Sequence, residues 1–223
     1  MELLLAEQTL LVALDDAKGT NTATWAGDGG LAAALLLDLG HRELLHVDAD
    51  RRLVAVDGEV PGHELLAEAH AAVRASEKPR KADDWLVRLP GQLKPLRERL
   101  ARGLVARGLL SEERSRLFGI FPQTRFPAAD PGPERELRQR LTDVLVAGRA
   151  PTEEEALLIG LLAPLGLVDR VVAKDQRRAA RQRAEQIGEL GVTGPAVRDA
   201  VQALQAAVLT AAVIIPAVTG GSS

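Results

Sequence analysis

Lys94 and Arg97 are the two side chains whose spacing best suits the binding of a phosphate group. They flank Pro95 in the stretch Leu93-Lys-Pro-Leu-Arg97, and proline is favoured in the first turn of a helix, where backbone N–H groups have no helical partner. Two cations three residues apart would then stand beside free N–H groups and the positive end of the helix dipole, which together attract an anion. The pattern predicts an anion site, although many helices that bind nothing also begin in this way.

Residues that could catalyse a reaction or hold a metal are few and poorly spaced. The chain has no cysteine, which excludes disulfides, thiolate metal ligands and cysteine nucleophiles. Its four histidines all lie between His41 and His70; His63 and His70 fall two helical turns apart, but they lack a third ligand and are predicted to be solvated. No serine stands in a nucleophile elbow, and there is no phosphate loop. We therefore expect no catalytic residue, no metal and no cofactor, and a protein that is not an enzyme.

A second unusual feature is a cluster of aromatic residues. Only 2% of the chain is aromatic, and three of its five aromatic residues lie between Phe118 and Phe126. The segment Arg114–Phe126 favours β-structure and is predicted to be a hairpin or an extended loop. If its large apolar side chains are exposed, they form a tip that enters a bilayer or contacts a partner; packing into the core is the equally good alternative. These side chains are Phe118, Ile120, Phe121 and Phe126.

Composition and charge narrow the class of protein. The chain has 223 residues, 46% of them hydrophobic and 26% charged, which is typical of a globular protein. The net charge of −3 offers no basic field for nucleic acid, although Lys78–Arg107 is locally basic and a second basic run, Lys174–Arg183, is predicted to be a solvated helix face. The longest apolar stretch, Ala206–Val218, is shorter than the roughly 20 residues of a membrane span. We expect a cytoplasmic protein without a spanning segment.

The elements that must position these residues are mostly helices. Leu31–Leu39 is apolar nearly all round and is predicted to be a buried helix, and Gln92–Arg107 is the helix that would carry Lys94 and Arg97. Gly27–Gly30 is predicted to be a loop that leads into a helix. The segments with helical spacing are Leu3–Leu14, His63–Ala75, Ala82–Leu89, Glu134–Ala147, Glu153–Leu165, Val168–Gly188 and Ala196–Val213. Glu43–Val47 and Leu53–Val56 are predicted to pair as a short hairpin.

These elements predict a mainly α fold. We expect a single compact helical domain over residues 1–218, with a buried helical core, surrounding amphipathic helices and short β-hairpins, followed by a flexible tail at residues 219–223. With so few aromatic residues, the core must be built from Leu, Val and Ala.

Taken together, the residues resemble the Golgi phosphoprotein 3 family over nearly the whole chain. The collinear landmarks are Leu10-Leu-Val-Ala-Leu-Asp-Asp-Ala-Lys-Gly19, Gly30-Leu-Ala-Ala-Ala-Leu-Leu-Leu-Asp-Leu39, Pro61-Gly-His-Glu-Leu-Leu66, Asp84-Trp-Leu86, Leu96-Arg-Glu-Arg-Leu100 and Leu104-Val-Ala-Arg-Gly-Leu-Leu110. The resemblance implies a helical adaptor that binds phosphatidylinositol 4-phosphate. The composition, rich in Ala, Leu and Arg and poor in Lys, favours a bacterial member of actinobacterial type.

The resemblance also implies which residues bind the lipid headgroup. Trp25 looks like the family's pocket tryptophan, and Lys94 with Arg97 look like its basic pair. The segment around Phe118–Phe126 falls where the family has a hydrophobic hairpin used in membrane insertion and self-association. The family's pocket arginine is missing, because Ala32 stands after Gly30-Leu31.

We therefore expect a peripheral membrane protein at the inner face of the membrane that recognises an anionic phospholipid headgroup, phosphatidylinositol 4-phosphate or a similar lipid. Client proteins and further copies of the chain are the other partners this implies, and nucleic acid is not one. The alternative is a helical scaffold for protein interactions that has lost its lipid specificity, which the alanine at position 32 favours. An enzyme would require the histidines to cluster with carboxylates in the folded chain.

Overall fold

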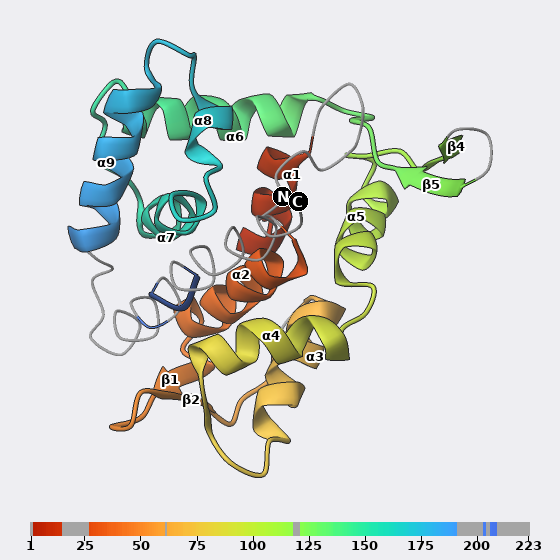
Figure 1. Cartoon of the computed structure of the whole chain (residues 1–223), viewed down its shortest axis with the longest axis vertical. Coiled ribbons are helices and arrows are strands. Elements are labelled where there is room, and N and C mark those ends of the chain that lie inside the picture. Colours follow the sequence, from red (N-terminus) through yellow and green to blue (C-terminus); the bar gives the residue numbers. More distant parts are fainter. Residues whose placement is uncertain are drawn as a thin grey trace, which may run out of the picture.

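Two buried helices run through the middle of the structure, a computed structural model that describes residues 2–14, 27–60, 62–117, 121–190, 203 and 206–208. They are α1 (Leu5–Ala13) and α2 (Asp28–His41). Every residue of α1 is buried, and so is α2 from Gly30 to Gly40, as expected for helices that are apolar on all sides. The other helices pack around this central pair (Figure 1), which confirms the buried helical core.

One group of elements packs against α2. It consists of α3 (Glu64–Arg74), α4 (Ala82–Gln92) and an antiparallel sheet with the order β1 (Leu45–Val47), β2 (Arg52–Ala55) and β3 (Arg80–Lys81). The turn between β1 and β2 is closed by Asp48, whose Oδ1 accepts the N–H groups of Asp50 at 2.9 Å and Arg52 at 2.8 Å. Such side-chain acceptors stabilise tight turns, and the predicted hairpin is confirmed.

The next elements form an arm beside the body. After α5 (Leu96–Ala106), strands β4 (Glu113–Leu117) and β5 (Phe121–Arg125) pair antiparallel, with Glu113 opposite Arg125. This hairpin extends away from the helices (Figure 1), as predicted. Phe126, however, is only 2% exposed and belongs to the core, so its assignment to an exposed tip was wrong. The residue follows the hairpin at its base, where the chain re-enters the body. Phe118 and Ile120 lie outside the described residues.

The remaining helices form a further group. They are α6 (Gly132–Leu145), α7 (Glu153–Leu162), α8 (Val168–Val171) and α9 (Arg177–Leu190). In this group α6, α7 and α8 pack against α1, and α9 packs against these three. Thr152 caps α7: its hydroxyl accepts the Glu155 N–H at 3.2 Å and the Glu155 carboxylate accepts the Thr152 N–H at 2.9 Å, which is a capping box.

The prediction of one helix over Val168–Gly188 was wrong. The chain becomes extended at Val172 and divides the segment into α8 and α9, because consecutive β-branched residues disfavour helix. The predicted helix Ala196–Val213 lies outside the described residues except at 203 and 206–208, which are helical.

The core is aliphatic, as the composition predicted. Its buried members form one cluster of Leu, Val, Ala and Ile, joined by Trp85 and Phe126. The mainly α fold with short antiparallel hairpins is therefore confirmed. Within the described residues, no helix is long and apolar enough to cross a membrane.

Several polar groups are buried among these helices. Glu7 is completely buried and accepts hydrogen bonds from the Leu4 N–H at 3.0 Å and from Arg107, with His63 3.6 Å away. His70, predicted to be solvated, is instead buried, and its Nε2 lies 2.9 Å from the Val56 carbonyl oxygen. The backbone acceptor satisfies the ring inside the protein, so that prediction was wrong.

Candidate functional site

The predicted anion site lies where α4 gives way to α5. Helix α4 continues to Gln92, and Pro95 is the residue that caps the N-terminus of α5, one position before the first turn in which it was expected. Lys94 therefore lies in the connection between the two helices and Arg97 in the first turn of α5. Both cations still stand at a helix N-terminus, where unpaired N–H groups and the helix dipole favour an anion.

The two cations differ in their surroundings. Lys94 is exposed, whereas Arg97 is half-buried and its Nε has no hydrogen-bond partner among the described residues. Burial lowers the pKa of Arg97, and the nearby carboxylates of Asp28 and Glu98 oppose that shift. A guanidinium partly removed from water and short of hydrogen-bond acceptors favours an incoming oxyanion.

The start of α2 borders this site. Asp28 opens α2 and acts electrostatically on Arg97, and Gly29 lies against α4, where an added Cβ would meet the Leu86 carbonyl oxygen at 3.5 Å. The first turns of α2 and α5 therefore meet beside α4. Trp25 precedes Asp28 by three residues but lies outside the described residues.

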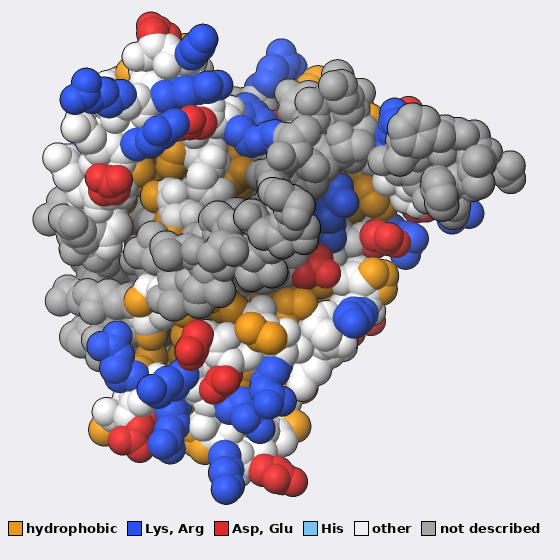
Figure 2. Space-filling model, in the orientation of Figure 1, with side chains coloured by type: hydrophobic (Ala, Val, Ile, Leu, Met, Phe, Trp, Pro, Cys, Tyr) orange, Lys and Arg blue, Asp and Glu red, His pale blue; other side chains and the backbone are white. Residues whose placement is uncertain are grey.

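Three other cations of the basic stretch Lys78–Arg107 form ion pairs with carboxylates. The pairs are Arg99 with Glu68 at 2.5 Å, Arg102 with Glu98 at 3.1 Å and Arg107 with Glu7 at 2.8 Å. Figure 2 shows Lys and Arg side chains gathered on the part of the surface over β1, β2 and α4, with Asp and Glu among them. The local excess of positive charge is therefore smaller than the sequence suggests, although Lys78, Arg80, Lys81 and Arg88 share with Lys94 and Arg97 the lack of an ion pair among the described residues. What distinguishes the last two is their place at the start of α5.

Ala32 adds no charge to this site. It is fully buried within α2, so the cation missing from the sequence pattern would have to come from elsewhere. The residue that sequence reasoning missed is Asp28, whose negative charge works against anion binding next to Arg97. Its only signal in the sequence was its place in Gly27–Gly30, which was predicted to be a loop but is helical from Asp28 onward, with Gly27 as the N-cap of α2.

The histidines do not form a catalytic or metal-binding group. His41 lies 3.9 Å from Glu153 and His63 lies 3.6 Å from Glu7, which are separate contacts on different helices. Among the described residues, no three His, Asp or Glu side chains are grouped in a way that would hold a metal.

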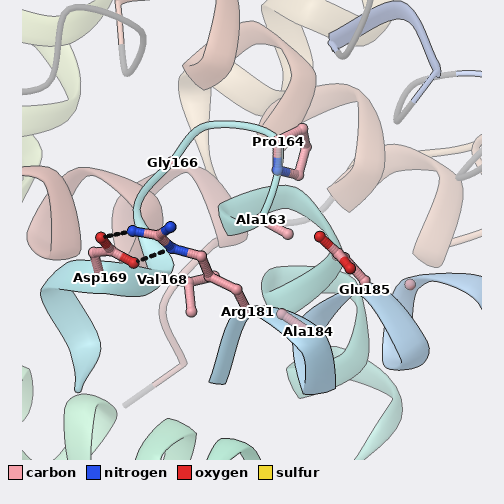
Figure 3. Close-up of a pocket in the computed structure, with 10 residues that line it drawn as sticks. Ala163, Pro164, Gly166, Val168, Asp169, Arg181, Ala184 and Glu185 are labelled. Atoms are coloured by element: carbon pink, nitrogen blue, oxygen red, sulfur yellow. Dashed lines mark hydrogen bonds and ion pairs between the residues drawn. The ribbon is translucent and has the colours of Figure 1, made fainter. Parts of the chain in front are cut away.

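Sequence reasoning also missed a cavity of about 370 Å³ between α7, α8 and α9. Small residues and three charged side chains line it (Figure 3). Its sequence signal is the spacing of small residues along α9 and Gly160 with Pro164 at the end of α7.

Comparisons with known proteins agree with the sequence resemblance. A family model described as Golgi phosphoprotein 3 (GPP34) matches residues 5–204. The chain is 32% identical over 153 residues to the vacuolar protein sorting-associated protein 74 of Eremothecium gossypii, and 31% identical over 150 residues to the protein of the same name from Schizosaccharomyces pombe. Each match covers 57% of this chain and 44% of the relative, so it spans less than half of each relative's length.

Proposed function

The chain belongs to the Golgi phosphoprotein 3 family, and from that membership we propose that it is a non-enzymatic adaptor that binds peripherally to the inner face of a membrane. The observation that carries this proposal is the arrangement of Lys94 and Arg97 at the start of α5, where Arg97 is half-buried and its Nε lacks a hydrogen-bond partner among the described residues. The proposal treats residues 1–218 as one domain and residues 219–223 as a tail.

The proposed ligand is a lipid headgroup that carries a phosphate, such as phosphatidylinositol 4-phosphate. Its phosphate would accept hydrogen bonds from Lys94, Arg97 and the first N–H groups of α5. Trp25 would contact the same headgroup: three residues of chain span at most about 11 Å, so covalent connection to Asp28 keeps position 25 near the start of α2. The negative charge of Asp28 beside Arg97 would weaken phosphate binding, so we expect only modest affinity for the headgroup.

Phe118, Ile120 and Phe121 are the proposed apolar anchors. Phe121 begins β5, and positions 118 and 120 fall between β4 and β5 in the sequence; the two strands extend from the body. Two cations at an anionic surface contribute about 1 kcal/mol each, and two or three partly inserted apolar side chains about 1.5 kcal/mol each. The sum of roughly 5–7 kcal/mol corresponds to a Kd of about 10 μM to a few hundred μM. Self-association through the hairpin would strengthen binding by multiplying the contacts.

Co-sedimentation with vesicles tests the proposal. The vesicles would contain phosphatidylcholine alone, phosphatidylcholine with phosphatidylserine, or phosphatidylcholine with phosphatidylinositol 4-phosphate. We expect the last to bind the protein most tightly, and the double variant K94A/R97A to lose most of that binding. The matched control is K174A/R178A, which removes the same charge from exposed positions before and on α9.

The alternative function is a scaffold for protein interactions that has lost lipid recognition. The burial of Ala32 and the carboxylate of Asp28 beside Arg97 favour it. Absence of binding to all three vesicles, together with a stoichiometric protein partner, would support the scaffold and reject lipid binding. Equal losses in K94A/R97A and K174A/R178A would show that general surface charge, and not the start of α5, holds the membrane.

A further inference from the structure

The cavity between α7, α8 and α9 is separate from the start of α5. Its lining comes from the end of α7, the turn that follows, α8 and the middle of α9. The volume of about 370 Å³ falls within the range of cavities that bind small molecules. It is therefore large enough for a compact organic ligand but not for a protein segment of several turns.

Most of the lining is small and apolar. Ala184 and Val168 are buried at the cavity wall, and Gly166 has a φ of +67° with open space where a side chain would begin. Gly160, Ala163, Pro164 and Gly188 complete this apolar part of the lining. Such a surface gains free energy by covering an apolar group and excluding water.

The charged side chains at the rim leave one carboxylate unmatched. Arg181 turns towards Asp169 and donates to it from Nε at 2.6 Å, with a second bond from its terminal nitrogen (Figure 3). The positive charge of Arg181 and the negative charge of Asp169 therefore cancel. Glu185 lies on the other side of the cavity (Figure 3) and forms no ion pair or hydrogen bond within the part of the chain described. Among the described residues, the rim therefore carries one negative charge, that of Glu185, without a cationic partner.

The end of α7 adds a second attraction for a cation. Helix α7 ends at Leu162, and the carbonyl groups of a final turn form the negative end of the helix dipole. In a regular helix the Gly160 carbonyl would accept the N–H of residue 164, but that residue is Pro164, which has none. Both residues line the cavity, so a backbone acceptor without its usual donor lies beside it.

We propose that this cavity binds a small organic ammonium ion, with its apolar body on the small residues of α7 and α9. The ammonium N–H groups would donate to the Glu185 carboxylate and to the carbonyl groups at the end of α7. A primary ammonium offers three donors for these acceptors. A quaternary ammonium has none and is usually bound by aromatic rings, and none of the described lining residues is aromatic.

A series of matched ligands tests whether binding requires the positive charge and the N–H donors of the ammonium group. Phenethylamine, phenethyl alcohol, 3-phenylpropionate and N,N,N-trimethylphenethylammonium share one apolar body and differ in the polar end. In calorimetric titrations of the full chain, we expect phenethylamine to bind with a Kd of about 0.1–1 mM. The alcohol and the trimethyl analogue should bind at least about threefold more weakly, and the carboxylate at least about tenfold more weakly. Equal affinity for amine and alcohol would overturn the proposal.

Variants then locate the binding site. E185Q should weaken phenethylamine binding roughly threefold to fivefold, the effect of one exposed charge, while E77Q, an equal charge change between α3 and β3, should leave it unchanged. A184L should fill the cavity and weaken binding at least about tenfold. Thermal unfolding would establish whether A184L folds. If A184L does not fold, the comparison of E185Q with E77Q decides whether phenethylamine binds at this cavity. Unchanged affinity in E185Q would reject the assigned site.

Discussion

Asp28 sets how strongly the start of α5 can attract an anion. Its carboxylate acts directly on the half-buried Arg97, and any phosphate that approaches Arg97 meets this negative charge as well. Electrostatic interactions near a protein surface are screened by water but not removed. The single acidic residue therefore opposes the two cations that the lipid proposal depends on.

The variant D28N tests this opposition. Removing the negative charge should strengthen binding to vesicles that contain phosphatidylinositol 4-phosphate roughly threefold to fivefold, equivalent to about 1 kcal/mol for one charge at a membrane surface. Co-sedimentation at moderate ionic strength measures the change, and E59Q provides an equal charge change at an exposed loop position. An equal gain in E59Q would mean that overall charge, and not the neighbourhood of Arg97, controls binding.

Asp38 makes folding stability depend on pH. Its carboxyl lies on buried α2, where its Oδ1 accepts the Leu5 N–H at 3.2 Å and its Oδ2 has no partner among the described residues. Burial raises the pKa of Asp38 from 3.8 to about 7, although the hydrogen bonds to Leu5 and Ala6 act in the opposite direction. The folded protein therefore binds this proton more tightly than the unfolded chain does.

The sign of the pH dependence follows from that difference. Stability from the protonated Asp38 is fully present below about pH 4 and is lost as pH rises through about 7, by roughly 1.4 kcal/mol per pH unit within that window. D38N stays neutral, so the difference in unfolding free energy between the variant and the original chain should shift in favour of D38N from pH 5 to pH 7. Chemical denaturation at several pH values measures it, and parallel curves would refute the assignment.

At the scale of elements, Arg107 joins the end of α5 to buried α1. It donates to both Glu7 oxygens, at 2.9 and 2.8 Å, and to the Glu2 carbonyl. Burial raises the pKa of Glu7, but the neighbouring His63 and the hydrogen bonds from Leu4 and Arg107 outweigh it and hold the pKa below its ordinary value. The charge of Glu7 is thus retained inside the protein because its partners come from other elements.

R107A should therefore destabilise the fold by about 3 kcal/mol, since it leaves the buried Glu7 carboxylate without its cation. The unfolding free energy from chemical denaturation measures the loss, and R107A/E7Q should recover part of it. R114A, which removes an exposed pair with Glu112, should change stability by no more than about 0.5 kcal/mol. Equal losses in R107A and R114A would contradict this explanation.

The same pair shows where sequence reasoning stops. The buried helix α2 and the hairpins were predicted because their signals are local: hydrophobic periodicity and turn residues. Glu7 and Arg107 lie a hundred positions apart, and no local pattern pairs them. Phe126 and His70 were misplaced for the same reason, because burial depends on what packs from elsewhere in the chain.

The candidate site was only partly predictable. Lys94 and Arg97 were found from the spacing of cations around a proline. The influence of Asp28 was not, because it depends on α2 beginning beside α5. The cavity behind α7 needs three helices to form, so the small residues along α9 and around Gly160 and Pro164 do not by themselves reveal it in the sequence.

For the whole molecule, the net charge of −3 works against approach to an anionic membrane. Long-range attraction therefore cannot come from the protein's total charge, and the proposed membrane binding would depend on the local arrangement at α5 and the hairpin. These two contributions respond differently to salt: exposed charges are screened beyond a Debye length of about 10 Å at 0.1 M, whereas partly buried ones are screened less.

Raising the salt concentration from about 0.05 to 0.5 M should consequently separate the two modes of binding. Binding to phosphatidylserine vesicles, held by exposed charges such as Lys94, should be nearly lost. Binding to phosphatidylinositol 4-phosphate should fall only about threefold, because a phosphate beside half-buried Arg97 is less exposed to ions and the apolar anchors are insensitive to screening. Co-sedimentation across this range measures both. If the two lipids lose binding in parallel, the start of α5 acts as part of a diffuse charged surface, and a specific headgroup site is excluded.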